Sequence, residues 1–378
     1  MKTLFPQLSS NPRAAYASAI GLGIVLAVLP LVVGLAGNAW VRMLDFALLY
    51  IMLALGLNIV VGYAGLLDLG YVAFYAVGAY LSALLPSPHR RENCGWIGAL
   101  FPDGLPLPIW LVIPLAAALA AAFGALLGAP TLRLRGDYLA IVTLGFGEIV
   151  RIFMNNLNAP LNITNGPQGI SNIDPGRIAG FDLSQTIAFG DYEVGAVHFY
   201  YYLFLVLTIA VVVVCVRLQD SRIGRAWVAI REDEIAAKAM GINTRNVKLL
   251  AFAMGASFGG VSGAMFASFQ GFVSPESFVL MESIVIVAMV VLGGMGHVPG
   301  VILGAILLYA IPESLRFIAK PVQEALFGTE LIAPEALRML LFGLAMVVIM
   351  LYRPSGLWPA PRHGDTPSRA ARAPGGGA

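Results

Sequence analysis

Residues 217–248 read RLQDSRIGRAWVAIREDEIAAKAMGINTRNVK, which is the longest strongly charged run in the chain, and long apolar segments adjoin it on both sides. The chain of 378 residues is 58% hydrophobic and only 12% charged, and its mean hydropathy is +0.81. About 20 consecutive apolar residues are needed to cross the hydrocarbon core of a bilayer, which is roughly 30 Å thick. The alternation of long apolar segments with short charged ones therefore predicts an all-α, polytopic integral membrane protein.

The apolar segments predict about ten transmembrane helices. They cover residues 16–36, 40–61, 69–85, 109–129, 138–154, 199–216, 249–270, 281–293, 298–317 and 337–352. The first segment is too long for the core of a signal peptide, so it is interpreted as a span. The third and the eighth are short and flanked by glycine, which is typical of broken or re-entrant helices.

Lysine and arginine are distributed unevenly over the two sides that these spans define. With the N-terminus in the cytoplasm, about two thirds of the basic residues fall on the inner side, in agreement with the positive-inside rule. This topology gives a cytoplasmic N-terminus (1–15), a transmembrane domain (16–352), and within that domain a cytoplasmic loop (217–248) and a long outer loop (155–198). The cytoplasmic tail (353–378) is rich in Pro, Gly, Ala and Arg, and we expect it to be disordered.

One short helix is predicted inside the charged run. Asp233 is placed to cap its N-terminus, and Gly241 is placed to end it in a left-handed conformation. The apolar residues of this helix form one stripe, which comprises Ile235, Ala236, Ala239 and Met240. A helix this short is not stable alone in water, so we expect the stripe to pack against another surface. The alternative is an ordinary cytoplasmic loop that contains a helical turn.

Ionisable residues and glycines near the span ends are candidates for a translocation pathway. Charged groups within a membrane usually face the interior of a bundle, and glycine allows helices to break there. The candidates are Gly65, Asp68, Gly70, Glu148, Gly293, Gly294 and Gly296. Two simpler roles stay open, because Asp68 is also placed to cap a helix and Glu148 is also placed to pair with Arg151 three residues later.

A second set of glycines, Gly255, Gly259 and Gly263, recurs at every fourth residue of one apolar segment. This spacing removes the side chains from one face of a helix and lets two backbones approach closely, which is how helices pack in lipid. We expect these glycines to have a structural role.

Several classes of function find no support in the sequence. No lysine follows a glycine, so the phosphate-binding loop G-x-x-x-x-G-K-[ST] is absent. Residues 255–259 match G-x-S-x-G by letters, but they lie in an apolar helical segment rather than at a strand-to-helix turn. The two cysteines and four histidines have no metal-ligand spacing, and the basic residues are not arranged for nucleic acid. We therefore expect no catalytic residue, no metal site and no cofactor bound by this chain.

Four segments carry a more specific signal: GYAGLLDLGYVAFYAVGAY (62–80), LRLRGDYLAIVTLGFGEIVR (132–151), GRAWVAIREDEIAAKAMGIN (224–243) and VVLGGMGHVPG (290–300). Together they closely resemble the LivM-type permease subunit of branched-chain amino acid ABC importers. The resemblance implies a multi-pass subunit of the bacterial inner membrane, embedded in the lipid bilayer and paired with a LivH-type permease. It also implies two cytoplasmic ATPases that bind ATP-Mg, and a periplasmic binding protein that delivers leucine, isoleucine or valine.

The resemblance further implies that the short helix in the charged run is a coupling helix, which docks into a groove of the ATPase through an E-A-A-x3-G signature. The matching residues are Glu234, Ile235, Ala236, Ala237, Ala239, Met240 and Gly241. The glutamate is shifted by one residue to Glu234, Ile235 stands in its place, and the downstream I-x-L-P is missing. In the outer loop, the family-like residues Asn165, Gly166, Gln168 and Gly169 either contact the binding protein or shape a turn.

Three other functions stay open at this point. A related ABC permease for urea or short amides would share the same architecture. A secondary transporter that works alone is permitted by the carboxylates near the spans, but it would leave the charged loop unexplained. A purely structural membrane scaffold is the third alternative.

Overall fold

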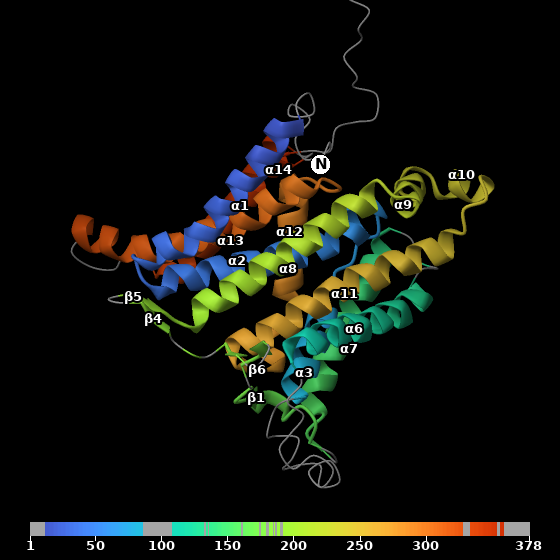
Figure 1. Cartoon of the computed structure of the whole chain (residues 1–378). Coiled ribbons are helices and arrows are strands. Elements are labelled where there is room, and N and C mark those ends of the chain that lie inside the picture. Colours follow the sequence, from blue (N-terminus) through green and yellow to red (C-terminus); the bar gives the residue numbers. More distant parts are fainter. Residues whose placement is uncertain are drawn as a thin grey trace, which may run out of the picture.

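A computed structural model describes residues 12–85, 108–131, 134, 136–159, 162–173, 175–178, 181–183, 185, 187–189, 192–327, 333–353 and 356–358. Within these residues every apolar segment predicted from the sequence coincides with a helix (Figure 1). Most of the tail that was predicted to be disordered lies outside the described residues, as does the start of the N-terminal segment.

The α-helices in chain order are α1 (Pro12–Gly34), α2 (Asn38–Asn58), α3 (Val72–Leu84), α6 (Ile109–Thr131), α7 (Asp137–Asn156), α8 (Ala196–Gln219), α9 (Arg222–Glu232), α10 (Glu234–Ala239), α11 (Thr244–Gln270), α12 (Leu280–Gly293), α13 (Val298–Phe327) and α14 (Pro334–Tyr352). Short helical turns are η2 (Ile59–Tyr63), η3 (Gly166–Gln168) and η4 (Pro275–Ser277). The strands are β1 (Ile170–Ser171), β2 (Arg177–Ile178), β3 (Phe181–Asp182), β4 (Ile187–Phe189), β5 (Tyr192–Val194) and β6 (Phe272–Val273), and they form only two-stranded pairs.

Among the described residues, five helical stretches are long and apolar enough to cross a membrane: Asn38–Tyr63, Ile109–Thr131, Ala196–Gln219, Thr244–Gln270 and Pro275–Gly293. Three shorter apolar helices accompany them, at Ile20–Gly34, Val72–Leu84 and Val298–Ser314. The all-α class of a multi-pass membrane protein is therefore supported, and the number of about ten crossings stays a prediction. The sequence predicted that the ninth helix ends at residue 317, but α13 continues to Phe327.

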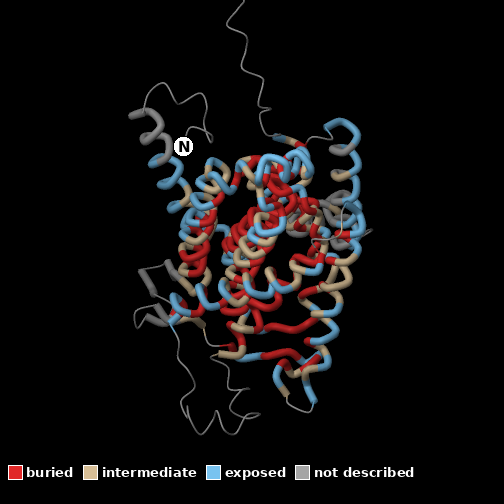
Figure 2. The backbone as a smooth tube through the Cα atoms, turned by 90° about the vertical axis from the view of Figure 1, so that its right-hand side faces the viewer, coloured by how far each residue is buried: buried red, intermediate tan, exposed pale blue. Residues whose placement is uncertain are grey.

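Helix α11 is central to the bundle and packs against α2, α3 and α6 (Figure 1). Its glycines allow this, as their spacing predicted: a Cβ built on Gly255 would lie 2.5 Å from Val60 Cγ2, and one on Gly263 would lie 2.7 Å from the backbone N of Ala79. Buried residues accordingly concentrate in the middle of the bundle, whereas exposed residues lie around it (Figure 2).

Two helices are interrupted where the sequence has its glycine-rich segments. Helix α2 passes into the π-helical turn η2, and an irregular stretch at 64–70 then leads toward α3. Helix α12 ends at Gly293, and α13 begins at Val298. The two breaks meet, because the backbone N–H of Gly296 donates to Asn58 Oδ1 at 2.8 Å.

Helix α3 is short, as the prediction of a broken helix requires. With 13 residues it is about 20 Å long, which is less than the thickness of a bilayer core.

The charged loop and the outer loop lie at opposite ends of α11 (Figure 1). This helix has 27 residues and is therefore about 40 Å long. The charged loop precedes it, and strand β6 follows it and pairs with β1 of the outer loop, with Ile170 opposite Val273. The two loops are thus on opposite sides of the bundle, as the predicted topology requires.

Candidate functional site

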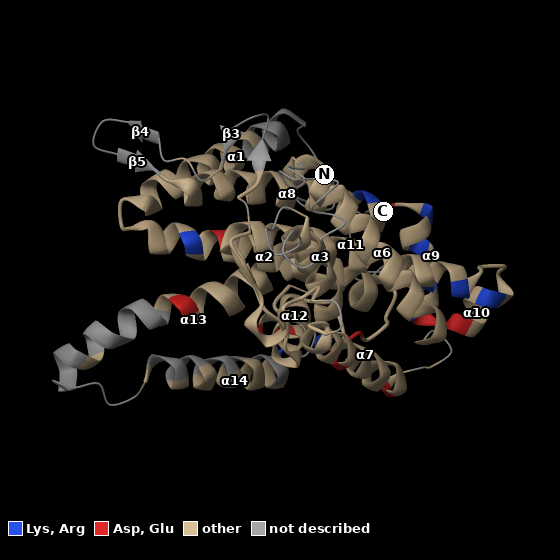
Figure 3. Cartoon of the chain, turned by 90° about the horizontal axis from the view of Figure 1, so that it is seen from below, with Lys and Arg blue, Asp and Glu red and all other residues tan. Residues whose placement is uncertain are grey.

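The charged run forms two short helices, α9 and α10, that project from one end of the bundle between α8 and α11 (Figure 1). Charged residues gather there, while the ribbon of most other helices carries few of them (Figure 3). The sequence pattern predicts α10 but not α9. The signal for α9 was present: Ser221 accepts a hydrogen bond from the Gly224 N–H at 3.1 Å, and Trp227 and Ile230 are buried on one face.

Both ends of α10 have the predicted caps. Asp233 Oδ1 accepts hydrogen bonds from the N–H groups of Ile235 (2.8 Å) and Ala236 (3.0 Å). At the other end Gly241 has a φ of +84°, and the N–H of Ile242 donates to the carbonyl of Ala237 at 3.1 Å. This pair of features is a Schellman motif, which satisfies carbonyls at a helix C-terminus. The cap predictions for Asp233 and Gly241 are confirmed.

The apolar stripe of α10 is not covered by this chain. Ile235 is 71% exposed and Met240 is 83% exposed. Ala236 and Ala239 are exposed as well, whereas Ala237 is only 4% exposed and faces the rest of the protein. An exposed isoleucine and methionine on a rigidly capped helix form a surface that suits a protein partner.

Glu234, the shifted glutamate, has a partner within the chain. Its Oε1 lies 2.8 Å from Lys248 Nζ at the start of α11, and the Lys248 side chain is only 6% exposed. Close by, the indole N–H of Trp227 donates to the Val247 carbonyl at 2.7 Å. These two contacts fasten the charged loop to α11, so Glu234 has a positioning role in addition to any contact with a partner.

Breaking this ion pair is expected to destabilise the loop. Glu234→Gln leaves a buried ammonium group without its charge partner; because the Glu234 side chain is 27% exposed, we expect a cost of about 1–2 kcal/mol rather than the roughly 3–5 kcal/mol of a fully buried pair. The thermal midpoint of the purified protein should fall by a few degrees. The double variant Glu234→Gln/Lys248→Met should recover most of the loss, whereas strictly additive losses would contradict direct pairing. Lys238→Met, on the exposed side of α10, is the control.

Asp68 lies in the first break, at a small cavity between α3, α6, α7 and α11. The cavity is lined by Asp68, Gly70, Phe74, Leu127, Thr131, Thr143, Phe146 and Phe252. Asp68 is 1% exposed, and its Oδ1 accepts a hydrogen bond from the Gly70 N–H at 2.9 Å. Its buried Oδ2 receives no hydrogen bond of standard geometry from the described residues. Asp68 therefore shapes the turn into α3 and also presents a carboxylate beside an apolar cavity.

Asp68→Asn separates these two roles, because the amide oxygen of asparagine can still accept the hydrogen bond from Gly70. We expect the variant to assemble normally and to slow the transport that the resemblance implies several-fold, since the negative charge and one acceptor oxygen have been removed. Asp68→Ala removes the hydrogen bond as well and should also reduce the yield of folded protein. If Asp68→Asn takes up its cargo at the wild-type rate, then the only role of Asp68 is to cap the turn into α3.

The other pathway candidates divide into two groups. Gly65 (φ +68°), Gly294 (φ +113°) and Gly296 (φ +83°) have left-handed backbones at the two breaks, a conformation that favours glycine, and Gly293 ends α12 at the second break. Gly70 packs against α7: a Cβ on this residue would lie 3.4 Å from the backbone N of Gly147. The structure therefore brings these candidates together at two places. The two helix breaks meet through the hydrogen bond between Gly296 and Asn58, and Asp68 and Gly70 line the same cavity.

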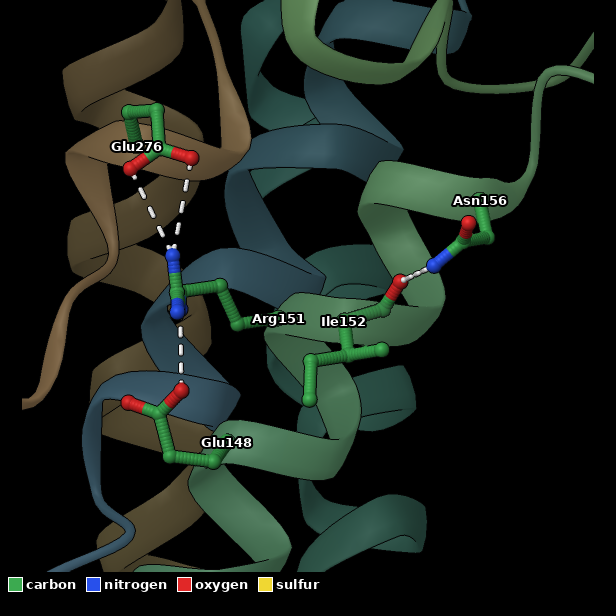
Figure 4. Close-up of polar contacts among 5 residues, drawn as sticks. All are labelled: Glu148, Arg151, Ile152, Asn156 and Glu276. Atoms are coloured by element: carbon green, nitrogen blue, oxygen red, sulfur yellow. Dashed lines mark hydrogen bonds and ion pairs between the residues drawn. The ribbon is translucent and has the colours of Figure 1, made fainter.

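Glu148 does not line the cavity around Asp68. Its Oε2 lies 3.0 Å from Arg151 Nε, so the pairing inferred from their spacing is confirmed. Arg151 Nη1 also lies 3.4 Å from Glu276 Oε2 in η4, and Arg151 stands between the two carboxylates (Figure 4). Arg151 therefore links α7 to the segment that precedes α12.

The outer-loop candidates form a tight turn. Asn165 has a left-handed backbone (φ 60°), and its Nδ2 donates to the Gly169 carbonyl at 2.9 Å. Gly166 and Gly169 are buried and also have positive φ. Among these four residues Gln168 is the exposed one, so the prediction of a contact with a binding protein now depends mainly on its side chain.

Comparison with known proteins matches the sequence of this chain to one family. The family described as "Branched-chain amino acid transport system / permease component" matches residues 40–350. The chain belongs to this permease family. The high-affinity branched-chain amino acid transport system permease protein LivM of Escherichia coli (strain K12) is 42% identical over 327 residues, which are 83% of this chain and 69% of the relative. The probable branched-chain amino acid transport permease protein LivM of Methanocaldococcus jannaschii is 30% identical over 335 residues, 82% of this chain and 90% of the relative.

A second type of permease is also related to this chain. The high-affinity branched-chain amino acid transport system permease protein LivH of Escherichia coli (strain K12) is 25% identical over 275 residues, which are 70% of the permease described here and 81% of LivH. No solved structure matches the permease.

Three residues of the permease that the sequence analysis did not single out connect its parts. Trp227 anchors the charged loop to α11, Asn58 joins the two helix breaks, and Arg231 reaches from α9 to the first break, where its Nη1 donates to the Gly62 carbonyl at 2.6 Å. Each of these hydrogen bonds joins a side chain to a distant backbone atom. A motif in the sequence does not reveal such contacts.

Proposed function

We propose that the permease is the membrane-spanning subunit of an ATP-driven importer that moves leucine, isoleucine and valine across the bacterial inner membrane. The observation that carries this proposal is the 42% identity with a LivM permease over most of the chain. The energy would come from ATP bound with Mg²⁺ by two separate ATPase subunits, because the sequence has no phosphate-binding loop.

The exposed stripe of α10 supports the proposed contact with an ATPase. A partner that covers Ile235 and Met240 would bury two large apolar side chains that are now largely in water. Burial of such side chains contributes about 1.5–3 kcal/mol each. The caps at Asp233 and Gly241 hold the stripe in one conformation before the partner binds, which lowers the entropic cost of docking. In this arrangement α9, α10, the N-terminus and the C-terminal tail lie in the cytoplasm.

A second permease of the LivH type would complete the membrane part, and a periplasmic binding protein would dock at the outer-loop end of α11. Docking outside and ATPase closure inside would bias the helix bundle between outward-facing and inward-facing states. Branched-chain amino acids have apolar side chains, which suit a path lined by residues such as Phe74, Phe146 and Phe252 beside Asp68. A helix N-terminus at one of the breaks would suit the carboxylate of the cargo.

Co-purification and reconstitution test this proposal. The permease, tagged and isolated from its native membranes, should bring with it two ATPases and a second permease. Liposomes with the whole complex should take up leucine only when ATP and the binding protein are both present. Uptake by the permease alone, driven by an ion gradient, would make it a secondary transporter. Competition by urea or short amides, but not by leucine, would assign it to the related ABC permeases instead.

A further inference from the structure

Arg231 connects the charged loop to the two helix breaks. It is the penultimate residue of α9, two residues before Asp233, which caps α10. Its guanidinium donates from Nη1 to the Gly62 carbonyl at 2.6 Å. The residues that form this bond are separated by 169 positions in the chain. Arg231 thus spans the distance between the helix that would dock a partner and the segment where α2 is interrupted.

The Gly62 carbonyl is available because α2 ends in a π-helical turn. Within η2 and just after it, the N–H groups of Ala64 and Leu66 donate to Ile59 and Val60, at 3.2 Å and 3.0 Å. The last carbonyls of a helix have no partner within the helix, and Arg231 satisfies one of them with a charge-assisted hydrogen bond. π-Helical turns are uncommon, and they occur frequently at functional sites.

Glycines make room for the Arg231 side chain on both breaks. A Cβ on Gly65 would lie 2.8 Å from Arg231 Cγ, and a Cβ on Gly296 would lie 3.3 Å from Arg231 Nη1. Both glycines also have left-handed backbones, with φ values of +68° and +83°. Because Gly296 is itself bound to Asn58 of α2, one guanidinium lies against the first break and the second break at once.

The other polar anchors of the loop lead elsewhere. Trp227 and Glu234 fasten α9 and α10 to residues 247 and 248, at the start of α11. Helix α11 runs uninterrupted from Thr244 to Gln270, so these two side chains are bonded to a continuous helix and not to a helix break. Among the described residues, Arg231 is therefore the charged side chain of α9 that forms a hydrogen bond with one of the helix breaks.

Resting on the proposed function, we propose that Arg231 is a positioning residue that transmits the movement of α10 to both helix breaks. When an ATPase shifts the stripe of α10, the short elbow at Asp233 carries the shift into the end of α9. Arg231 then pulls on the Gly62 carbonyl and, through the contact of the guanidinium with Gly296, alters how the two breaks pack. Removing this bond leaves the ATPase docked while its movement no longer reaches the pathway.

The test compares three variants in the complete reconstituted complex, with binding protein, leucine and ATP. Arg231→Met keeps the length of the side chain and removes the donors. Arg231→Lys keeps one charged donor but loses the planar fork of the guanidinium. Arg225→Met is the matched control, since Arg225 lies on the same helix, is exposed, and among the described residues donates to the Asp220 carbonyl of its own loop at 2.9 Å. The readout is the number of leucine molecules taken up per ATP hydrolysed.

We expect Arg231→Met to lower this ratio on the order of tenfold, the factor that corresponds to one charge-assisted hydrogen bond, while ATP hydrolysis continues. Arg231→Lys should restore part of the ratio, and Arg225→Met should leave it at the wild-type value. A variant that is merely misfolded would reduce uptake and hydrolysis together, so the ratio would not change. An unchanged ratio in an Arg231→Met complex that hydrolyses ATP at the wild-type rate, or an equal fall in Arg225→Met, overturns the inference. If the wild-type complex itself shows no ATP-driven uptake, the proposed function fails instead.

Discussion

Gly241→Val is expected to abolish most ATP-driven uptake while the protein still folds and inserts. The backbone of Gly241 is left-handed, with a φ of +84°, and a β-branched residue adopts this conformation only at a cost of roughly 1–3 kcal/mol. A Cβ at this position meets no atom within 4 Å, so the effect comes from the backbone and not from a clash. The Schellman motif would open, and α10 would lose the orientation in which its stripe is presented.

The measurement is leucine uptake per ATP hydrolysed in liposomes, with Gly241→Asn as the control. Asparagine tolerates the left-handed conformation much better than valine, so Gly241→Asn should keep most of the coupled uptake. If Gly241→Val transports at the wild-type rate, then the conformation of α10 does not matter for coupling, and the docking role proposed for this helix is wrong.

Gly263→Ala is expected to prevent the native packing of α11 against α3. The added Cβ would collide with the carbonyl of Tyr75 and would lie 2.7 Å from the backbone N of Ala79. Both obstacles are backbone atoms, so the two helices must move apart, at a cost of at least about 1–3 kcal/mol. Alanine is the better helix former by about 1 kcal/mol, so helix propensity alone would predict the opposite sign.

Gly145→Ala is the control for this prediction. Gly145 also lies within a helix, α7, but a Cβ there meets no atom within 4 Å. The yield of monodisperse permease in detergent and its thermal midpoint should fall sharply for Gly263→Ala and should be unchanged or slightly raised for Gly145→Ala. Equal behaviour of the two variants would mean that the close approach of α11 and α3 is not essential to the fold.

The local features of the charged loop were predictable from the sequence because their hydrogen bonds join near neighbours. Asp233 caps N–H groups two and three residues ahead. Gly241 ends the helix in a left-handed backbone conformation that favours glycine. The same holds for the pair of Glu148 and Arg151. The α9 helix was not predicted, although its N-cap at Ser221 and its buried face of Trp227 and Ile230 are local features of the same kind.

Long-range contacts were not predictable, because nothing in a single sequence specifies which distant segment a side chain will reach. Arg151 also lies beside Glu276, 125 residues away, and Glu234 pairs with a lysine of the following helix rather than standing free for a partner. The exposure of Gln168 in the outer loop is a similar case, since it depends on how the whole chain folds and not on near neighbours alone.

The sequence by itself determined the class of the protein, its helical segments and the capped helix in its charged loop. Hydrophobic length and local hydrogen bonding depend on residues close together in the chain, so they can be inferred without coordinates. Only the tertiary structure decided that the two helix breaks meet at Asn58 and Gly296, and that Arg231 binds one of them and lies against the other. The physical reason is that packing around α11 brings together segments more than 160 residues apart, and an unpaired carbonyl such as that of Gly62 then accepts a hydrogen bond from the donor that packing has placed beside it.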